Sequence, residues 1–163
     1  MARLVLSDAS PLIGLSIVEG LSWLPSLFGE VWVPAQVLDE VLSGQVVRGE
    51  ADIRRALDQG WLRAWSQPVP QIELPDLDEG ESACIRIAVA HGKDALLLID
   101  ERAGRAVATE LGVTLAGTAA LIGMAKARGL VTSARQAFET LHGSDFRISS
   151  QVIRTVLERV GEN

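Results

Sequence analysis

Two aspartates in this sequence follow short apolar runs and could act together. Asp8 comes shortly after Leu4-Val5-Leu6, and Asp100 follows residues 95–99, the most hydrophobic run in the chain. If the two runs are neighbouring parallel strands, both carboxylates lie at the sheet edge where α/β proteins bind ligands. Carboxylates in one crevice repel each other unless they share a proton or a cation. A hard divalent metal would relieve that repulsion, although either aspartate alone could simply cap the following helix.

A third acid falls on the apolar face of a predicted helix that Asp78 can cap. Helical spacing places Glu81 on the same side as Cys84 and Ala88, so we expect it to point towards the core. Glu79 falls on the opposite side and is expected to face solvent. A glutamate that faces the core is costly unless a cation or hydrogen bonds satisfy it, so the position favours a metal ligand over a pair with arginine.

The remaining polar candidates cannot be settled by spacing. Asp39 and Glu40 flank an apolar helical stripe at similar angles, so either side chain could turn inward. The Ser10 hydroxyl could point at the Asp8 site, or it could cap a helix. Thr118 has the same two possible roles, and capping is favoured.

Short apolar runs alternate with amphipathic segments along the chain. Strands are predicted at residues 4–6, 31–33, 95–99 and 113–115, with an edge strand at 61–65. Helices are predicted from near residue 11 and over residues 37–42, 51–59, 78–91, 101–110 and 118–128, with two more after residue 131. Residues 67–76 hold three of the six prolines and predict a loop. The alternation predicts an α/β fold with a parallel sheet between helices.

The length of 163 residues suits a single domain, which we assign to residues 1–163 with residues 143–163 as a C-terminal helical extension. The net charge of −6 argues against a protein that coats duplexes with a broad basic surface. It does not exclude a nuclease whose carboxylates hold cations. The composition of the chain, with nearly half of its residues apolar and no charge-rich tract, predicts a compact fold.

The cysteine and histidine content bears on the cellular compartment and on which metal could bind. The single cysteine, Cys84, excludes an internal disulfide and fits a reducing compartment. Asp8 and Pro11 interrupt the first apolar run, so no export signal or membrane segment is expected, and we predict a cytoplasmic protein. His91 and His142 have no cysteine cluster beside them, which makes a zinc site improbable.

Four segments in this order and spacing resemble the PIN-domain family, in particular its compact prokaryotic branch related to VapC-like toxin ribonucleases. They are LSDASPLI at 6–13, VPAQVLDEV at 33–41, GESA at 80–83 and LLIDER at 97–102. The resemblance spans nearly the whole chain and implies a three-layer α/β/α sandwich with a parallel central sheet. It also implies that Asp8, Glu40, Glu81 and Asp100 occupy the metal-binding positions. Many relatives have aspartate where Glu81 stands, although glutamate is common in this branch.

The activity that the resemblance implies is a ribonuclease that hydrolyses RNA phosphodiesters with Mg²⁺ or Mn²⁺. Asp8 and Asp100 would bind the metal directly, whereas Glu40 and Glu81 would complete its shell, partly through water.

Three further residues could support this site. Ser10 matches the small hydroxyl residue that often follows the first aspartate in the family. Arg102 and Arg105 lie on the helix beside Asp100 and could contact substrate phosphate, although surface ion pairs are the commoner role of arginine.

The biological setting leaves alternatives open. The resemblance suggests the toxin of a toxin-antitoxin pair, with an antitoxin protein as a possible partner; the main alternative is a non-catalytic PIN-fold module in a protein or RNA complex. A receiver domain or an aspartate-nucleophile phosphatase fits less well, because Ser10 stands two residues after Asp8 where that phosphatase needs an acid. The closing apolar stripe, residues 152–160, packs on the domain body or supplies the surface of an expected homodimer or antitoxin contact.

Overall fold

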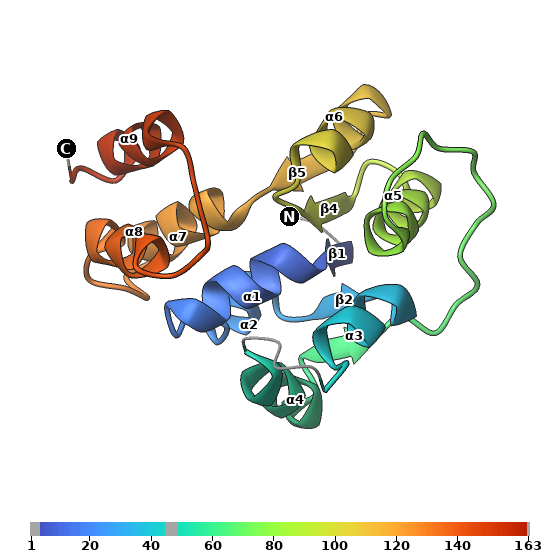
Figure 1. The fold of residues 1–163 in the computed structure, drawn as a ribbon, viewed down its shortest axis with the longest axis horizontal. Helices are drawn as coiled ribbons and strands as arrows, with labels where there is room; N and C mark the ends of the chain where they lie inside the picture. The colour runs from blue at the N-terminus through green and yellow to red at the C-terminus, as the bar shows by residue number, and fades with distance from the viewer. Residues whose placement is uncertain (1–3, 45–48, 163) are drawn as a thin grey trace.

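The computed structural model describes residues 4–44 and 49–162. Within these residues five parallel strands form one sheet in the order β3-β2-β1-β4-β5. The strands are β1 (Leu4–Ser7), β2 (Val31–Val33), β3 (Leu62–Ala64), β4 (Ala95–Leu98) and β5 (Thr114–Ala116). Helices cover both sides of the sheet, with α1 to the left of the strands and α5 to the right in Figure 1. The three-layer α/β/α sandwich with a parallel central sheet is therefore confirmed, and β3 lies at an edge as expected.

The helices follow the predicted alternation, with one addition. They are α1 (Ala9–Ile17), α2 (Trp23–Phe28), α3 (Ala35–Val41), α4 (Glu50–Gln59), α5 (Glu79–His91), α6 (Arg102–Glu110), α7 (Thr118–Ala127), α8 (Ala134–His142) and α9 (Ser150–Arg159). The short helix α2 was not predicted, because its six residues show too little periodicity. Burial of Trp23, Leu24 and Leu27 stabilises it.

The register of the central strands decides where the acidic residues lie. Strand β1 lies between β2 and β4, with Ser7 opposite Leu98. Beyond that pair the Asp8 N–H donates to the Leu98 carbonyl over 2.9 Å. Leu6 and Leu97 are fully buried, and each such leucine contributes roughly 1.5–3 kcal/mol when it leaves water. The two best-buried strands thus end side by side, and Asp8 and Asp100 follow them at the same edge.

A long connection joins β3 to α5. Residues 65–78 form neither helix nor strand, as the prolines predicted. Arg86 on α5 fastens this connection, because its Nε donates to the Ile72 carbonyl over 2.8 Å. None of the helices in the described residues is both long enough and apolar enough to span a membrane.

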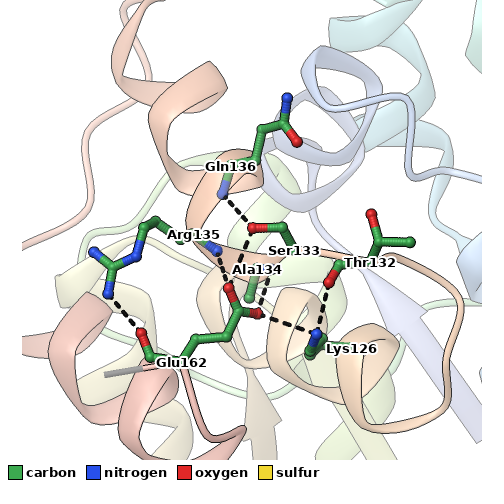
Figure 2. A network of polar contacts seen from close by, with 7 residues as sticks. All are labelled: Lys126, Thr132, Ser133, Ala134, Arg135, Gln136 and Glu162. Atoms are coloured by element: carbon green, nitrogen blue, oxygen red, sulfur yellow. Dashed lines mark hydrogen bonds and ion pairs between the residues drawn. The ribbon is translucent and has the colours of Figure 1, made fainter.

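The last helices pack on the domain through α7. On α9, Val156 and Leu157 are buried, whereas Val152 is 44% exposed. The last described residue, Glu162, ties the end of the chain to the start of α8, as Figure 2 shows. Its carboxylate accepts hydrogen bonds from the backbone N–H groups of Ala134 (2.7 Å) and Arg135 (3.2 Å) and from the Ser133 hydroxyl (3.2 Å), and Lys126 Nζ lies 3.6 Å away. At least part of the closing stripe therefore packs on the domain body.

Candidate active site

Asp8 lies buried at the end of β1, with only 4% of its surface exposed. It occupies the N-cap position of α1, yet its side chain makes no capping hydrogen bond. Burial raises the pKa of Asp8 to about 7; a backbone hydrogen bond at Ala9 opposes this shift, whereas the charges of Asp78, Glu40 and Glu101 add to it. The carboxyl group of Asp8 is thus within electrostatic reach of three other acids.

Glu81 points inward from α5, as its helical position predicted. It is 6% exposed, whereas Glu79 is exposed on the other side of the helix. Its Oε2 is buried and has no hydrogen-bond partner in the described part of the chain. The pKa of Glu81 is raised to about 8 by burial first and then by a hydrogen bond and charge repulsion from Asp78, with smaller effects of Asp8 and Glu101. A buried carboxyl oxygen without a partner is costly, and a bound cation would relieve that cost.

Asp100 is held by Thr118, the first residue of α7. Its Oδ1 accepts the backbone N–H of Thr118 over 2.8 Å, and its Oδ2 accepts the Thr118 hydroxyl over 2.8 Å. Burial raises the pKa of Asp100, against the opposing effects of these Thr118 hydrogen bonds and of Arg105. Thr118 therefore orients Asp100 and does not cap its own helix, so the capping role expected for its side chain was wrong. Asp100 does not cap α6 either, because Glu101 occupies that N-cap position.

Glu40 lies at the rim of the acidic group. Both Asp39 and Glu40 are exposed at the end of α3, so burial does not separate them. Partial burial, followed by the charges of Asp78 and Glu101, raises the pKa of Glu40. The Glu40 side chain is thus within electrostatic reach of the same cluster.

Two acids in this cluster were missed as site residues. Asp78 caps α5 as predicted, since its Oδ1 accepts the Glu81 N–H over 2.7 Å. The same carboxylate raises the pKa of both Asp8 and Glu81. Glu101 is exposed, as expected, yet its charge acts on Asp100 and the other acids. The available signals were that Asp78 stands one helical turn before Glu81 and that Glu101 adjoins Asp100.

Three glycines leave room around the carboxylates. A Cβ atom on Gly104 of α6 would collide with Glu81 Oε2, and one on Gly117 would lie 2.9 Å from Asp100 Oδ1. A Cβ atom on Gly80 would lie 3.3 Å from Asp8 Oδ1. Any larger residue at 104 or 117 would therefore fill space that now borders a carboxylate.

Of the possible supporting residues, Ser10 and Arg102 line one groove together with Asp100. Ser10 is half-buried and Arg102 is exposed. Arg105 also lines this groove, and its Nη1 donates to the Ile99 carbonyl over 2.7 Å, which fixes the guanidinium beside Asp100. The structure therefore brings all three close to the acidic edge.

The acidic cluster suits a hard divalent cation by its chemistry. No three His, Cys, Asp or Glu side chains among residues 4–44 and 49–162 already converge as metal ligands. The donors are nevertheless carboxylate oxygens, which Mg²⁺ and Mn²⁺ prefer. The buried Glu81 Oε2, which has no partner in the described residues, supplies a carboxylate oxygen that a cation could bind. The donor chemistry of these residues therefore fits such an ion.

Comparison with known proteins agrees with the fold. A family model described as PIN domain matches residues 4–162, which is almost the whole chain. No curated protein and no solved structure matches the chain.

Proposed function

Because the chain belongs to the PIN-domain family, whose members are generally nucleases that use divalent metals, we propose that it is an Mg²⁺- or Mn²⁺-dependent endoribonuclease. The observation that supports this most is the acidic cluster at the ends of β1 and β4. There the pKa of Asp8 is raised to about 7 and that of Glu81 to about 8, and Glu81 Oε2 has no partner in the described residues. Acids that repel one another in this way favour a cation between them.

Each acid has a distinct part in this proposal. Asp8, Glu81 and Asp100 would hold the cation directly, with Glu40 joining from the rim through water. When bound, the cation would supply an activated water and neutralise charge on the scissile phosphate. Asp78 would keep the start of α5, and therefore Glu81, in place.

Two neighbours position groups for this chemistry. Thr118 fixes both oxygens of Asp100, so the aspartate needs little further ordering when a substrate binds. Arg105 is anchored on the Ile99 carbonyl, and its positive charge would face a phosphate held at the acidic edge.

The test is cleavage of a mixed-sequence RNA pool by the purified protein with Mg²⁺, Mn²⁺ or EDTA. We expect metal-dependent cutting that falls roughly 100-fold or more in Asp8→Asn and Asp100→Asn. Asp39→Asn, an exposed acid beside Glu40, is the matched control and should cut like the wild type. Circular dichroism would check that each variant folds.

Cutting that persists in EDTA or in a folded Asp8→Asn protein would contradict the proposal. A wild-type protein that cuts no RNA with either metal would support a non-catalytic binding module. The toxin role adds one expectation: expression in a bacterial cell would arrest growth, and Asp8→Asn would remove that effect.

A further inference from the structure

A groove of about 790 Å³ begins at the acidic edge and leads away from it. Ser10, Asp100 and Glu101 line its inner end, and residues of α9 line its outer end. The start of α7 and residues 145–149 also line the groove. In Figure 1, α6 and α9 both lie above α7, and all three helices contribute residues to the lining. The proposed catalytic acids and the C-terminal helix therefore share one continuous hollow.

Arginines outnumber acids in the lining of this groove by four to three. The arginines are Arg102, Arg105, Arg147 and Arg159. Of the acids in the lining, Asp100 and Glu101 belong to the acidic cluster, and Asp145 is exposed. Away from the catalytic end the groove is thus locally basic, in a chain whose net charge is −6.

Three of these arginines have no acidic partner, unlike several others on the surface, whereas the fourth, Arg105, lies beside Asp100. The ion pairs elsewhere join Arg54 to Glu50 (3.2 Å), Arg55 to Asp52 (3.0 Å) and Arg63 to Glu30 (2.7 Å). Within the described residues, Arg102, Arg147 and Arg159 form no ion pair with a carboxylate. Arg147 is nevertheless anchored, because its Nη1 donates to the carbonyls of His142 (2.8 Å) and Ser144 (3.1 Å). The groove therefore presents guanidinium groups that are available to an anionic ligand.

The groove also offers apolar surface beside these charges. Val152 lines it and is 44% exposed, which is unusual for a large aliphatic side chain in this domain. Ile148 and Phe146 line it as well and are half-buried. Single-stranded nucleic acid needs both features, because its phosphates bind cations and its bases pack on apolar or planar groups.

We propose that this groove binds the single-stranded RNA next to the cut, with Arg147 and Arg159 contacting phosphates beyond the acidic cluster. The inference rests on the proposed ribonuclease function and extends its substrate site to α9. Continuity with the catalytic acids favours RNA over a protein partner, because a strand held at Asp100 has to leave along this path or across the surface. The arginines without acidic partners favour the groove as the path of the RNA strand.

The decisive variant is Arg159→Gln in an Asp8→Asn background, in which RNA would remain intact. Fluorescence anisotropy would measure the affinity for a labelled single-stranded RNA of mixed sequence at several salt concentrations. Loss of one phosphate contact should weaken binding roughly three- to tenfold and flatten the slope of log affinity against log salt by about 0.7. Arg154→Gln, an exposed arginine of the same helix outside the groove, is the matched control and should change neither value.

Two results would overturn the groove as an RNA site: unchanged RNA binding in Arg159→Gln, or an equal loss in Arg154→Gln. If Arg159→Gln leaves RNA binding unchanged but loses self-association on size exclusion, the groove is a protein interface instead. Cleavage by the otherwise wild-type chain separates the two proposals. If the chain cuts RNA and Arg159→Gln changes neither binding nor cutting, only the groove proposal is contradicted. If RNA binding depends on Arg159 but the chain cuts no RNA, only the nuclease proposal is contradicted.

Discussion

Two groups of carboxylates in this domain have opposite surroundings. At the ends of β1 and β4, Asp8 and Glu81 are buried among other acids, and their pKa values are raised. At the end of the chain, Glu162 also loses some solvent, which raises its pKa. Hydrogen bonds from backbone N–H groups and a hydroxyl, together with the charge of Lys126, outweigh that effect and lower the pKa of Glu162 (Figure 2).

The difference separates a structural acid from an acid kept for a ligand. Glu162 is stable as an anion because the start of α8 and Lys126 satisfy it within the fold. Glu81 has a buried oxygen that no donor among the described residues satisfies. Proteins accept such costs mainly where function needs them. The comparison therefore points to the strand ends as the functional site and to a structural role for Glu162.

The largest effect should come from closing the space beside Glu81. Gly104→Ala would place a methyl group against Glu81 Oε2 and 2.8 Å from Ile99 Cδ1. A displacement of about 1 Å in a catalytic group costs on the order of 100-fold in rate, so RNA cleavage should fall by about that factor. Gly143→Ala is the control, because its Cβ would lie 3.4 Å from the Thr140 carbonyl oxygen, an ordinary contact. A folded Gly104→Ala protein with full activity would break the proposed role of Glu81.

The next effect concerns stability without metal. A raised carboxyl pKa means that the folded protein holds a proton that the unfolded chain releases, so the free energy of unfolding falls as pH rises from about 4 to about 8. In Glu81→Gln the side chain is a neutral amide at every pH, so it carries no charge that the buried site would have to accommodate. In EDTA at pH 8 it should therefore be more stable than the wild type by about 1–2 kcal/mol, and this gap should narrow towards pH 5.

Urea unfolding at the two pH values would measure this gap. Glu79→Gln, an exposed acid of the same helix, should show no such gap. Equal stability of wild type and Glu81→Gln at pH 8 would contradict the repulsion within the acidic cluster.

The smallest effect should come from Glu162, with the opposite sign. Glu162→Ala removes the acceptor for two N–H groups at the start of α8, which should lower the free energy of unfolding by about 1 kcal/mol. Because the pKa of Glu162 is lowered, its contribution is present above the unfolded pKa and is lost as pH falls. RNA cleavage should stay at the wild-type rate. Glu158→Ala, exposed on α9, is the control. Loss of cleavage in Glu162→Ala but not in Glu158→Ala would contradict a purely structural role for Glu162.

Most of the sheet could be predicted from the sequence, because the apolar runs that form β1 and β4 are short and almost wholly buried. The inward position of Glu81 also followed from helical spacing, which is a local property. The roles of Thr118 and Asp78 did not follow in the same way. Thr118 bonds Asp100 across 18 residues of chain, and Asp78 acts on Asp8 only after the sheet has formed. Such contacts depend on the packing of distant segments, which local patterns do not carry.

Glu40 shows a different limit. Periodicity left Asp39 and Glu40 equal, and both are exposed in the structure. Only the raised pKa of Glu40, caused by its partial burial and by Asp78 and Glu101, links it to the cluster. The family resemblance chose Glu40, but a physical reason for that choice needed the positions of residues on other elements.

The most direct test of the central claim is Mn²⁺ binding to the intact protein, measured by titration calorimetry at pH 7.5. The account predicts that the wild type and Glu162→Gln bind Mn²⁺ alike, whereas Asp8→Asn binds at least tenfold more weakly. If Asp8→Asn binds as the wild type does, or if Glu162→Gln loses binding, the strand-end acids are not the cation site.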